Sequence, residues 1–381
     1  MSHAAGPASV PVPQLDGVIA TQSSICLLSA EENRLAYRGY DVGELAEKAS
    51  FEETAYLLLA GRLPNRDQLT TFVRALRDRR KLPRRIARLL RDIPAGADPM
   101  ALLRTAVSAL GLEPAAPSPL DIPPAALDLV ALMPTLVGTA HRRARGEKPL
   151  TPRRGLNTAA NLLYLVHGQE PARALADAFE VALSLRADNE LNPSTFAARV
   201  AAATKADVHG CVTAALAALA GPLHGGHALA VYRLLEEIGS PDRLGAIVDA
   251  RLATGKTFPG FGHPVYRGED PRTGPMRRAA EAAAEAAGDR SWLELAQVLE
   301  ARVRPATGKF ANVDFYLAPL YRAVGIPPEL FAPVFAVARM PGWLAHVLEQ
   351  QGQDGLIRPR AAYIGQRRQQ FVGLRRRSVN P

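Results

Sequence analysis

Cysteine is nearly absent from this chain of 381 residues, and the two that occur, Cys26 and Cys211, lie far apart. They form no pair motif, so we expect no disulfide framework and a reducing compartment, the cytoplasm. The first residues, about 1–14, lack a basic start followed by an apolar core. They are therefore predicted to form a flexible leader and not a signal peptide.

Long apolar runs are absent as well. The longest apolar stretch, roughly 125–140, is interrupted by Asp128 and Pro134. A membrane-spanning helix needs about 20 apolar residues, so we expect no membrane partner. With 48% hydrophobic residues, the chain is nevertheless long enough to bury a large core in about two domains.

Acidic residues are too few to balance the basic ones, and the net charge is +9. The densest basic cluster lies in the C-terminal tail and consists of Arg367, Arg368, Arg375, Arg376 and Arg377. Charge runs usually face solvent, and no zinc-finger, RNP-like or basic-heptad pattern accompanies this one. We therefore expect no nucleic-acid partner; such a role would require binding with a steep salt dependence.

Helical periodicity dominates the chain and predicts a mostly α fold. Ser50 and Glu53 have the spacing of a capping box, and Gly61 stands where that helix would end. Apolar residues repeat at helical spacing in 69–76, in 196–219 (one long helix or a broken pair), in 277–287 and in 331–346, which contains Pro341 and is expected to bend there.

Strand signals are few. Segments 24–28 and 35–37, with a polar turn between them, predict one small hairpin. The Pro-rich stretch 114–124 predicts a surface connection.

Four polar segments stand where a helix bundle would favour apolar residues, and Arg339 follows them. They are Arg186–Arg199, Gly221–Gly226, Phe258–Arg272 and Asn312–Tyr316. Within them, His224 and His263 each lie in a Gly- and Pro-rich loop, which allows close approach of the backbone to a ligand. Histidine suits proton transfer near neutral pH, although a hydrogen-bonded structural role is the alternative for both. His224 and His227 also form an H-x-x-H spacing, but no third ligand accompanies it, so no metal is expected.

Asp314 lies between Val313 and Phe315. Apolar surroundings would raise its pKa and suit it as a general base; the alternative is a helix N-cap. Arg339 shares a helix face with Phe335 and Trp343, so it should be buried against a protein carboxylate or an anionic ligand. Arg272 and Arg358 would by default be exposed. Gly260-Phe261-Gly262 lacks the third glycine of a dinucleotide fingerprint, and no Walker motif is present.

Together, these segments resemble the citrate synthase family from about Leu15 to Gly365. The motifs that carry the resemblance are GPLHGG, GFGHPVYR followed by DPR, NVDFY, FAVARMPGW and IRPRAAY, in family order and spacing. The opening segment GVIATQSSICLL and PMALLRTAVSALG match as well. The resemblance implies an acyltransferase that condenses acetyl-CoA with oxaloacetate, without a permanently bound cofactor.

The resemblance also implies roles for single residues. Asp314 would remove a proton next to the thioester, His224 would stabilise the enol or enolate, and His263 would polarise the oxaloacetate carbonyl. Arg272, Arg339 and Arg358 would hold carboxylates. Residues Thr257, Phe258, Pro259, Gly260 and Phe261 match the loop that meets coenzyme A, and Arg267 would approach its phosphates.

The implied architecture is all-α with two domains and a homodimer in which Arg358 enters the neighbouring site. The large domain would take residues 1–223 and 321–381, and the small, coenzyme A-binding domain residues 224–320. Closure of the cleft between them would bring Asp314 to the acyl-CoA and exclude water.

Asn189 departs from the family, which usually has an oxaloacetate-binding histidine at this position. Loss of one charge-assisted contact would cost roughly 1–3 kcal/mol, so weaker or altered acceptor binding is expected. His227, where alanine is usual, is a candidate for partial compensation. Smaller departures are Ala311 and Leu317-Ala318, which could shift the base slightly.

Pro264 resembles 2-methylcitrate synthases, so propanoyl-CoA is the alternative acyl donor. Further alternatives are a paralogue with a changed 2-oxo acid acceptor, and a catalytically weak protein that senses coenzyme A or a metabolite. The retained Asp314, His224 and His263 count against the sensor.

Overall fold

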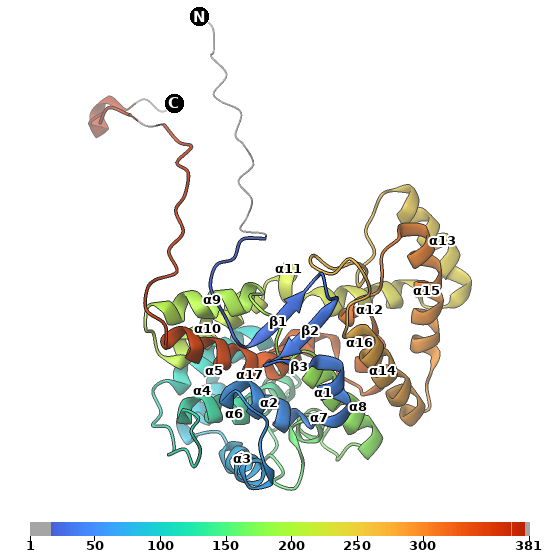
Figure 1. Cartoon of the computed structure of the whole chain (residues 1–381), viewed down its shortest axis with the longest axis horizontal. Helices are drawn as coiled ribbons and strands as arrows, with labels where there is room; N and C mark the ends of the chain where they lie inside the picture. The colour runs from blue at the N-terminus through green and yellow to red at the C-terminus, as the bar shows by residue number, and fades with distance from the viewer. Residues whose placement is uncertain (1–16, 367, 378–381) are drawn as a thin grey trace, which may run out of the picture.

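The computed structural model describes residues 17–366 and 368–377, so the predicted leader and Arg367 lie outside the described residues. The fold is all-α, as the periodicity predicts, apart from one small antiparallel sheet of order β1-β2-β3 (Figure 1). β1 (Cys26–Ser29) pairs with β2 (Arg34–Tyr37), which confirms the predicted hairpin. The short β3 (Tyr40–Asp41) was not predicted.

The first half of the chain forms a helical body. Its helices are α1 (Val42–Lys48), α2 (Phe51–Ala60), α3 (Arg66–Arg79), α4 (Arg84–Asp92), α5 (Pro99–Leu110), α6 (Pro124–Ala144), α7 (Thr158–His167) and α8 (Arg173–Leu185). The predicted capping box begins α2, since Ser50 and Glu53 each accept a hydrogen bond from the other's backbone N–H. Gly61 ends this helix with a φ of 77°. The Pro-rich stretch is, as predicted, the largely exposed connection from α5 to α6.

The apolar repeat over 196–219 is a broken pair of helices, α9 (Pro193–Ala203) and α10 (Val208–Leu219). The break has a local cause. Lys205 adopts a left-handed conformation with a φ of 61°, and Asp207 then caps α10 by accepting from the N–H of Gly210. Asn192 caps α9 in the same way.

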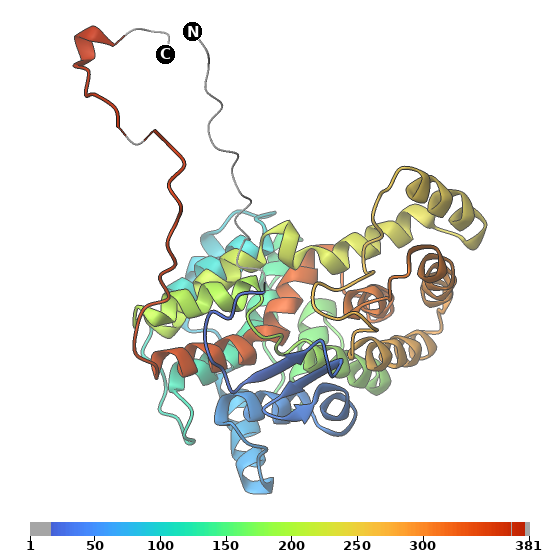
Figure 2. The same cartoon turned by 45° about the horizontal axis from the view of Figure 1, so that its top comes forward.

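The next helices project to one side of the body in both views (Figures 1 and 2). They are α11 (Pro222–Gly225), α12 (His227–Ile238), α13 (Pro241–Ala253), α14 (Thr273–Ala287), α15 (Ser291–Thr307) and α16 (Val313–Ala323). α14 packs against both α8 and α16, and so joins this lobe to the body. The domain boundaries 1–223, 224–320 and 321–381 stay a prediction.

α17 (Phe331–Gln351) runs through the body, against α6, α9, α10 and α2, and follows the 3₁₀ turn η1 (Pro328–Leu330). Segment Pro328–Gln351 is long and apolar enough to cross a membrane, but 94% of its apolar window is buried within the protein. A buried central helix explains this composition equally well. Pro341 lies inside α17, as predicted.

Beyond Gln351, the chain leaves the body as an extended segment that includes the 3₁₀ turn η2 (Leu374–Arg376) (Figure 1). Its large apolar side chains are exposed, and they are Leu356, Tyr363, Ile364, Phe371 and Leu374.

Candidate functional site

The three residues predicted to be catalytic come from three separate elements. His224 lies in the short helix α11, His263 in the loop between α13 and α14, and Asp314 in the first turn of α16. Asn312, and not Asp314, is the N-cap of α16, because its side chain accepts from the Asp314 N–H at 3.0 Å. The alternative of Asp314 as a cap is therefore wrong.

Hydrogen bonds join the loop of His263 to the segment that precedes Asp314. The N–H of Gly262 donates to Phe310 O, and the N–H of Asn312 donates to Gly260 O, both at 2.8 Å. The Asn312 side chain donates to Gly262 O, also at 2.8 Å. Asp314 and His263 therefore belong to one connected unit.

Asp314 differs electrostatically from the sequence-based expectation. Burial, the largest single influence, acts to raise its pKa, but the Arg186 guanidinium, which donates to Oδ1, and other neighbouring charges together hold the pKa below its usual range. His227 and Arg272 act in the same direction. The expectation of a raised pKa was wrong, because it considered only the apolar neighbours in sequence.

His224 is held neutral. Burial, followed by the charges of Arg339 and Arg186, lowers its pKa to about 3. Its Nε2 lies 2.8 Å from Ser194 Oγ.

Ser194 has a single proton and two possible acceptors. Its Oγ accepts from the indole N–H of Trp343 at 3.0 Å and lies 2.7 Å from Asn192 Oδ1. If Ser194 donates to His224 instead of Asn192, the imidazole proton lies on Nδ1 and is available to a ligand. Ser194 thus decides which nitrogen of His224 can donate.

His263 is also neutral, and its tautomer is determined by the backbone. Nδ1 accepts from the N–H groups of Val265 and Tyr266 at 3.1 and 3.2 Å, which leaves the proton on Nε2. Burial and then the charge of Arg272 lower the pKa to about 4. His263 is therefore a neutral hydrogen-bond donor through Nε2.

Arg272 and Arg339 are both buried, which corrects the expectation that Arg272 is exposed. Asp270 binds Nε and Nη2 of Arg272 at 2.9 and 2.8 Å, so its Nη1 remains for another partner. Arg339 donates through Nε to the backbone oxygen of Arg186 at 2.7 Å. Its Nη1 is buried without a hydrogen-bond partner among the described residues, as expected of a group that awaits an anion.

Arg358 lies apart from this cluster. It is exposed on the extended C-terminal segment, which projects away from the body (Figure 2). The structure therefore brings together two of the three predicted carboxylate-binding arginines within one chain.

The predicted coenzyme A loop, Thr257–Phe261, leads directly into His263, and Arg267 is exposed beyond it. Arg251, which the sequence reasoning missed, supports this loop. Its Nη2 donates to Thr257 O at 3.1 Å, and its guanidinium lies 5.7 Å from the centroid of the Phe258 ring.

Asn189 lies between the buried Asp188 and the exposed Glu190. Its Oδ1 is buried without a hydrogen-bond partner in the described part of the chain. The adjacent Asp188 accepts from His346 Nε2 at 3.2 Å, which anchors this segment to α17. His227 is exposed at the start of α12.

The main omission of the sequence reasoning is Arg186, the partner of Asp314. A signal was present, because Arg186 follows the apolar run of α8 just as Arg339 follows apolar residues in α17. Ser194 was missed because His224 and Trp343, its neighbours in space, are distant in sequence. Asp270 pairs with Arg272 only two residues away, and it was missed because the sequence does not show that the pair is buried.

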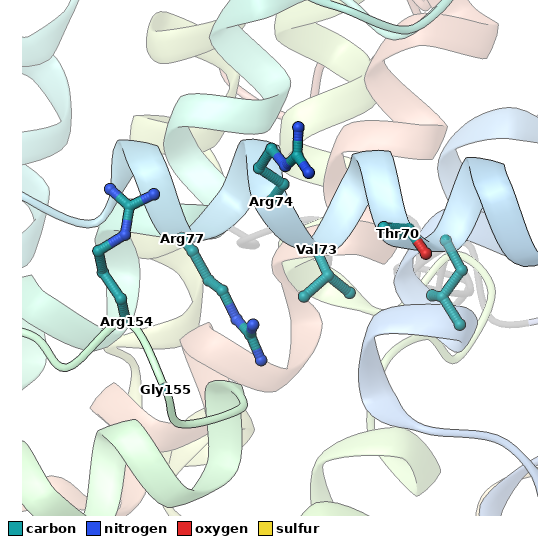
Figure 3. A pocket seen from close by; sticks show the side chains of 7 residues that line it. Thr70, Val73, Arg74, Arg77, Arg154 and Gly155 are labelled. Carbon is teal, nitrogen blue, oxygen red and sulfur yellow. The ribbon is translucent and has the colours of Figure 1, made fainter.

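Among the residues that the structure describes, no group of three or more His, Cys, Asp or Glu could hold a metal ion. Two hollows open elsewhere on the body. One of about 580 Å³ lies between α3 and the segment at Gly155, toward which Arg77 points (Figure 3). The other, of about 640 Å³, is lined by residues of 81–95 and 135–152. Neither contains a predicted site residue.

Comparison with known proteins places these residues in context. The family described as "Citrate synthase, C-terminal domain" matches residues 14–360. Citrate synthase 2 of Bacillus subtilis is 41% identical over 96% of this chain and 98% of its own. The 2-methylcitrate synthase of Mycobacterium tuberculosis is 39% identical over 94% of this chain and 92% of its own.

A solved structure extends the similarity to the fold. The citrate synthase of Thermoplasma acidophilum, in a ternary complex with carboxymethyl coenzyme A and oxaloacetate, superposes with a TM-score of 0.86. It is 29% identical in sequence, and the match covers 95% of this chain and 98% of that one.

Proposed function

Because the chain belongs to the citrate synthase family, we propose that it condenses acetyl-CoA with oxaloacetate and hydrolyses the thioester to give citrate and CoA. The observation that supports this most directly is the set of protonation states in the cluster. An ionised Asp314 is a base, and the neutral His224 and His263 are donors whose tautomers are set by Ser194 and by the backbone.

In the first step, Asp314 takes a proton from the methyl carbon of the acetyl group. The electron pair of the C–H bond moves toward the thioester oxygen, where Nδ1–H of His224 donates a hydrogen bond to the developing charge. This role requires Ser194 to donate to Nε2 of His224, a geometry that the 2.8 Å separation allows.

In the second step, the enol carbon attacks the ketone carbon of oxaloacetate. The Nε2–H of His263 polarises the ketone oxygen and supplies its proton. Nη1 of Arg272 and Nη1 of Arg339 would bind the carboxylates. Water then cleaves the thioester carbon–sulfur bond, so the acyl carbon becomes a carboxylate and CoA leaves as the thiol. No bound cofactor or metal is needed.

We also propose a homodimer. Arg358 and the apolar side chains on the same segment support it, since they are exposed and the segment itself projects away from the body (Figure 1). The partner's Arg358 would complete each site. The buried free thiols of Cys26 and Cys211 agree with a cytoplasmic location.

Propanoyl-CoA is the second candidate donor, because a 2-methylcitrate synthase is 39% identical to this chain. One methylene changes discrimination by only about 1–3 kcal/mol, so both donors should react. Release of CoA thiol with oxaloacetate, measured for both donors at matched concentrations, tests the proposal. Absence of release with either donor would contradict it.

Asn189 is expected to affect the binding of the acceptor, oxaloacetate. If its amide has replaced a stronger contact, Asn189→His should lower the Michaelis constant for oxaloacetate by about one to two decades. An unchanged constant would exclude this explanation. A screen of other 2-oxo acids with the unaltered enzyme would then test for a changed acceptor.

A further inference from the structure

Arg186 is linked to two of the three predicted catalytic groups, directly to Asp314 and through the Phe335 ring to His224. It caps the C-terminus of α8, and its side chain is only 5% exposed. Nη1 donates to Asp314 Oδ1, and the guanidinium lies 3.8 Å from the centroid of the Phe335 ring. The Phe335 ring also contacts His224, and the centroids of the two rings lie 5.7 Å apart.

Phe335 and α8 restrict the guanidinium of Arg186. A cation that lies over an aromatic ring and is largely shielded from solvent is held both electrostatically and sterically. Nε of Arg186 is buried and has no hydrogen-bond partner within the described residues. The ion pair of Nη1 with Asp314 is therefore the main polar contact of the Arg186 side chain. The carboxylate is thereby restrained in turn.

We propose that Arg186 is a positioning residue for the base: it holds the Asp314 carboxylate ionised and correctly oriented until the acyl thioester arrives. This inference rests on the proposed function, in which Asp314 removes the proton.

Proton abstraction changes the charge around Arg186. When Asp314 gains the proton, its charge disappears and a buried cation would remain unpaired, which is costly. In the same step, negative charge develops on the thioester oxygen beside His224, on the other side of Phe335. Arg186 therefore favours the ionised form of Asp314 before the step, and the protonation of Asp314 is matched by the negative charge that develops beside His224.

Other groups also face Asp314 and could influence its ionisation. They are His227 on α12, Arg272 before α14, His224 on α11, His263 in its loop and Tyr321 on α16. None of these five groups makes an ion pair with Asp314 among the described residues, whereas Arg186 does. Among these charged neighbours, Arg186 should accordingly have the largest effect on the ionisation of Asp314.

The test compares Arg186→Gln with Arg186→Lys, which keeps the charge. For Arg186→Gln, we expect the acid limb of kcat/KM to move up by about one pH unit or more, and kcat to fall. Arg186→Lys should return the acid limb of kcat/KM most of the way to its position in the unaltered enzyme. Arg278→Gln serves as control, because Arg278 on α14 makes only an exposed ion pair, with Glu47 on α1.

A higher Michaelis constant for oxaloacetate with an unmoved acid limb would overturn the proposal and assign Arg186 to acceptor binding. A second readout does not depend on turnover. Carboxyl ¹³C titration, with the Asp314 signal assigned from Asp314→Asn, should show that signal titrating at higher pH in Arg186→Gln. If it titrates unchanged, the inference fails; if it moves but no thiol is released by any variant or the parent enzyme, the proposed reaction fails instead.

Discussion

At the scale of single residues, two histidines are kept neutral by the same kind of environment. Burial and neighbouring arginines lower the pKa of His224 to about 3 and that of His263 to about 4. A neutral imidazole donates a hydrogen bond without first taking a proton from solvent. Both residues therefore stay in the form that the reaction needs across the physiological range.

This predicts the pH dependence of activity. Because the neutral forms are active, activity is complete above the folded pKa values and is lost as the pH falls through about 4. We expect kcat/KM for both substrates to show no acid limb near 6.5, the ordinary pKa of histidine. A limb at that position, in a protein shown to be folded there, would contradict the assignment.

At the scale of elements, the close approach of α17 to segment 186–188 holds Arg339 against the backbone oxygen of Arg186, two residues before Asp188. Gly342 permits this approach. A Cβ there would lie 2.3 Å from the backbone oxygen of Ala187 and 2.5 Å from Asp188 Oδ1.

Gly342→Ala should therefore force these elements apart. We expect a loss of about 1–3 kcal/mol in unfolding free energy and a raised Michaelis constant for oxaloacetate. Gly352→Ala, at the end of the same helix, is the matched control, because the nearest atom to an added Cβ there is 3.4 Å away. If the two changes lower the unfolding free energy equally in denaturant unfolding, close packing at Gly342 is not the cause of the loss.

The start of α2 and the start of α7 meet at two carboxyl groups. Glu52 accepts from the N–H and hydroxyl of Thr158, and Glu180 accepts from the N–H of Phe51 at 3.0 Å. Burial, followed by the charge of Glu52, raises the pKa of Glu180 to about 7.

The folded state therefore binds more protons here than the unfolded state between about pH 4.5 and 7. Its unfolding free energy should fall as the pH rises through this window, by on the order of 2 kcal/mol, and level off above it. Glu180→Gln, which mimics the protonated form, should remove this slope in urea unfolding. Glu170→Gln, in an exposed pair with Arg153, should keep it.

At the scale of the whole molecule, the proposed dimer makes each site depend on two chains. Arg358 and Asp314 would serve one site from different protomers. A hybrid that pairs an Arg358→Ala protomer with an Asp314→Asn protomer would contain one site with both native residues.

Co-expression of these two inactive variants should thus restore up to about half of the native activity per hybrid dimer, whereas each variant alone should stay inactive. Thiol release by the purified hybrid measures this. No recovery in a hybrid confirmed as a dimer would show that each chain uses its own Arg358, or none.

The sequence by itself determined most of the helices and named the candidate reacting groups. Capping at Ser50 and termination at Gly61 depend on residues within a few positions of the backbone they affect, so local patterns suffice. The break before Asp207 was left open by the apolar repeat and was decided by the structure. His224, His263 and Asp314 stand in contiguous motifs, so the sequence was sufficient to select them as candidates.

Only the tertiary structure decided the charges and partners of these groups. Asp314 was expected to have a raised pKa, yet its pKa is lowered by Arg186, 128 residues away in the chain, together with His227 and Arg272. Arg272 was expected to be exposed, yet packing buries it with Asp270. Burial and Coulomb interactions depend on distance in space, and the folding of α8, α14, α16 and α17 against one another sets those distances.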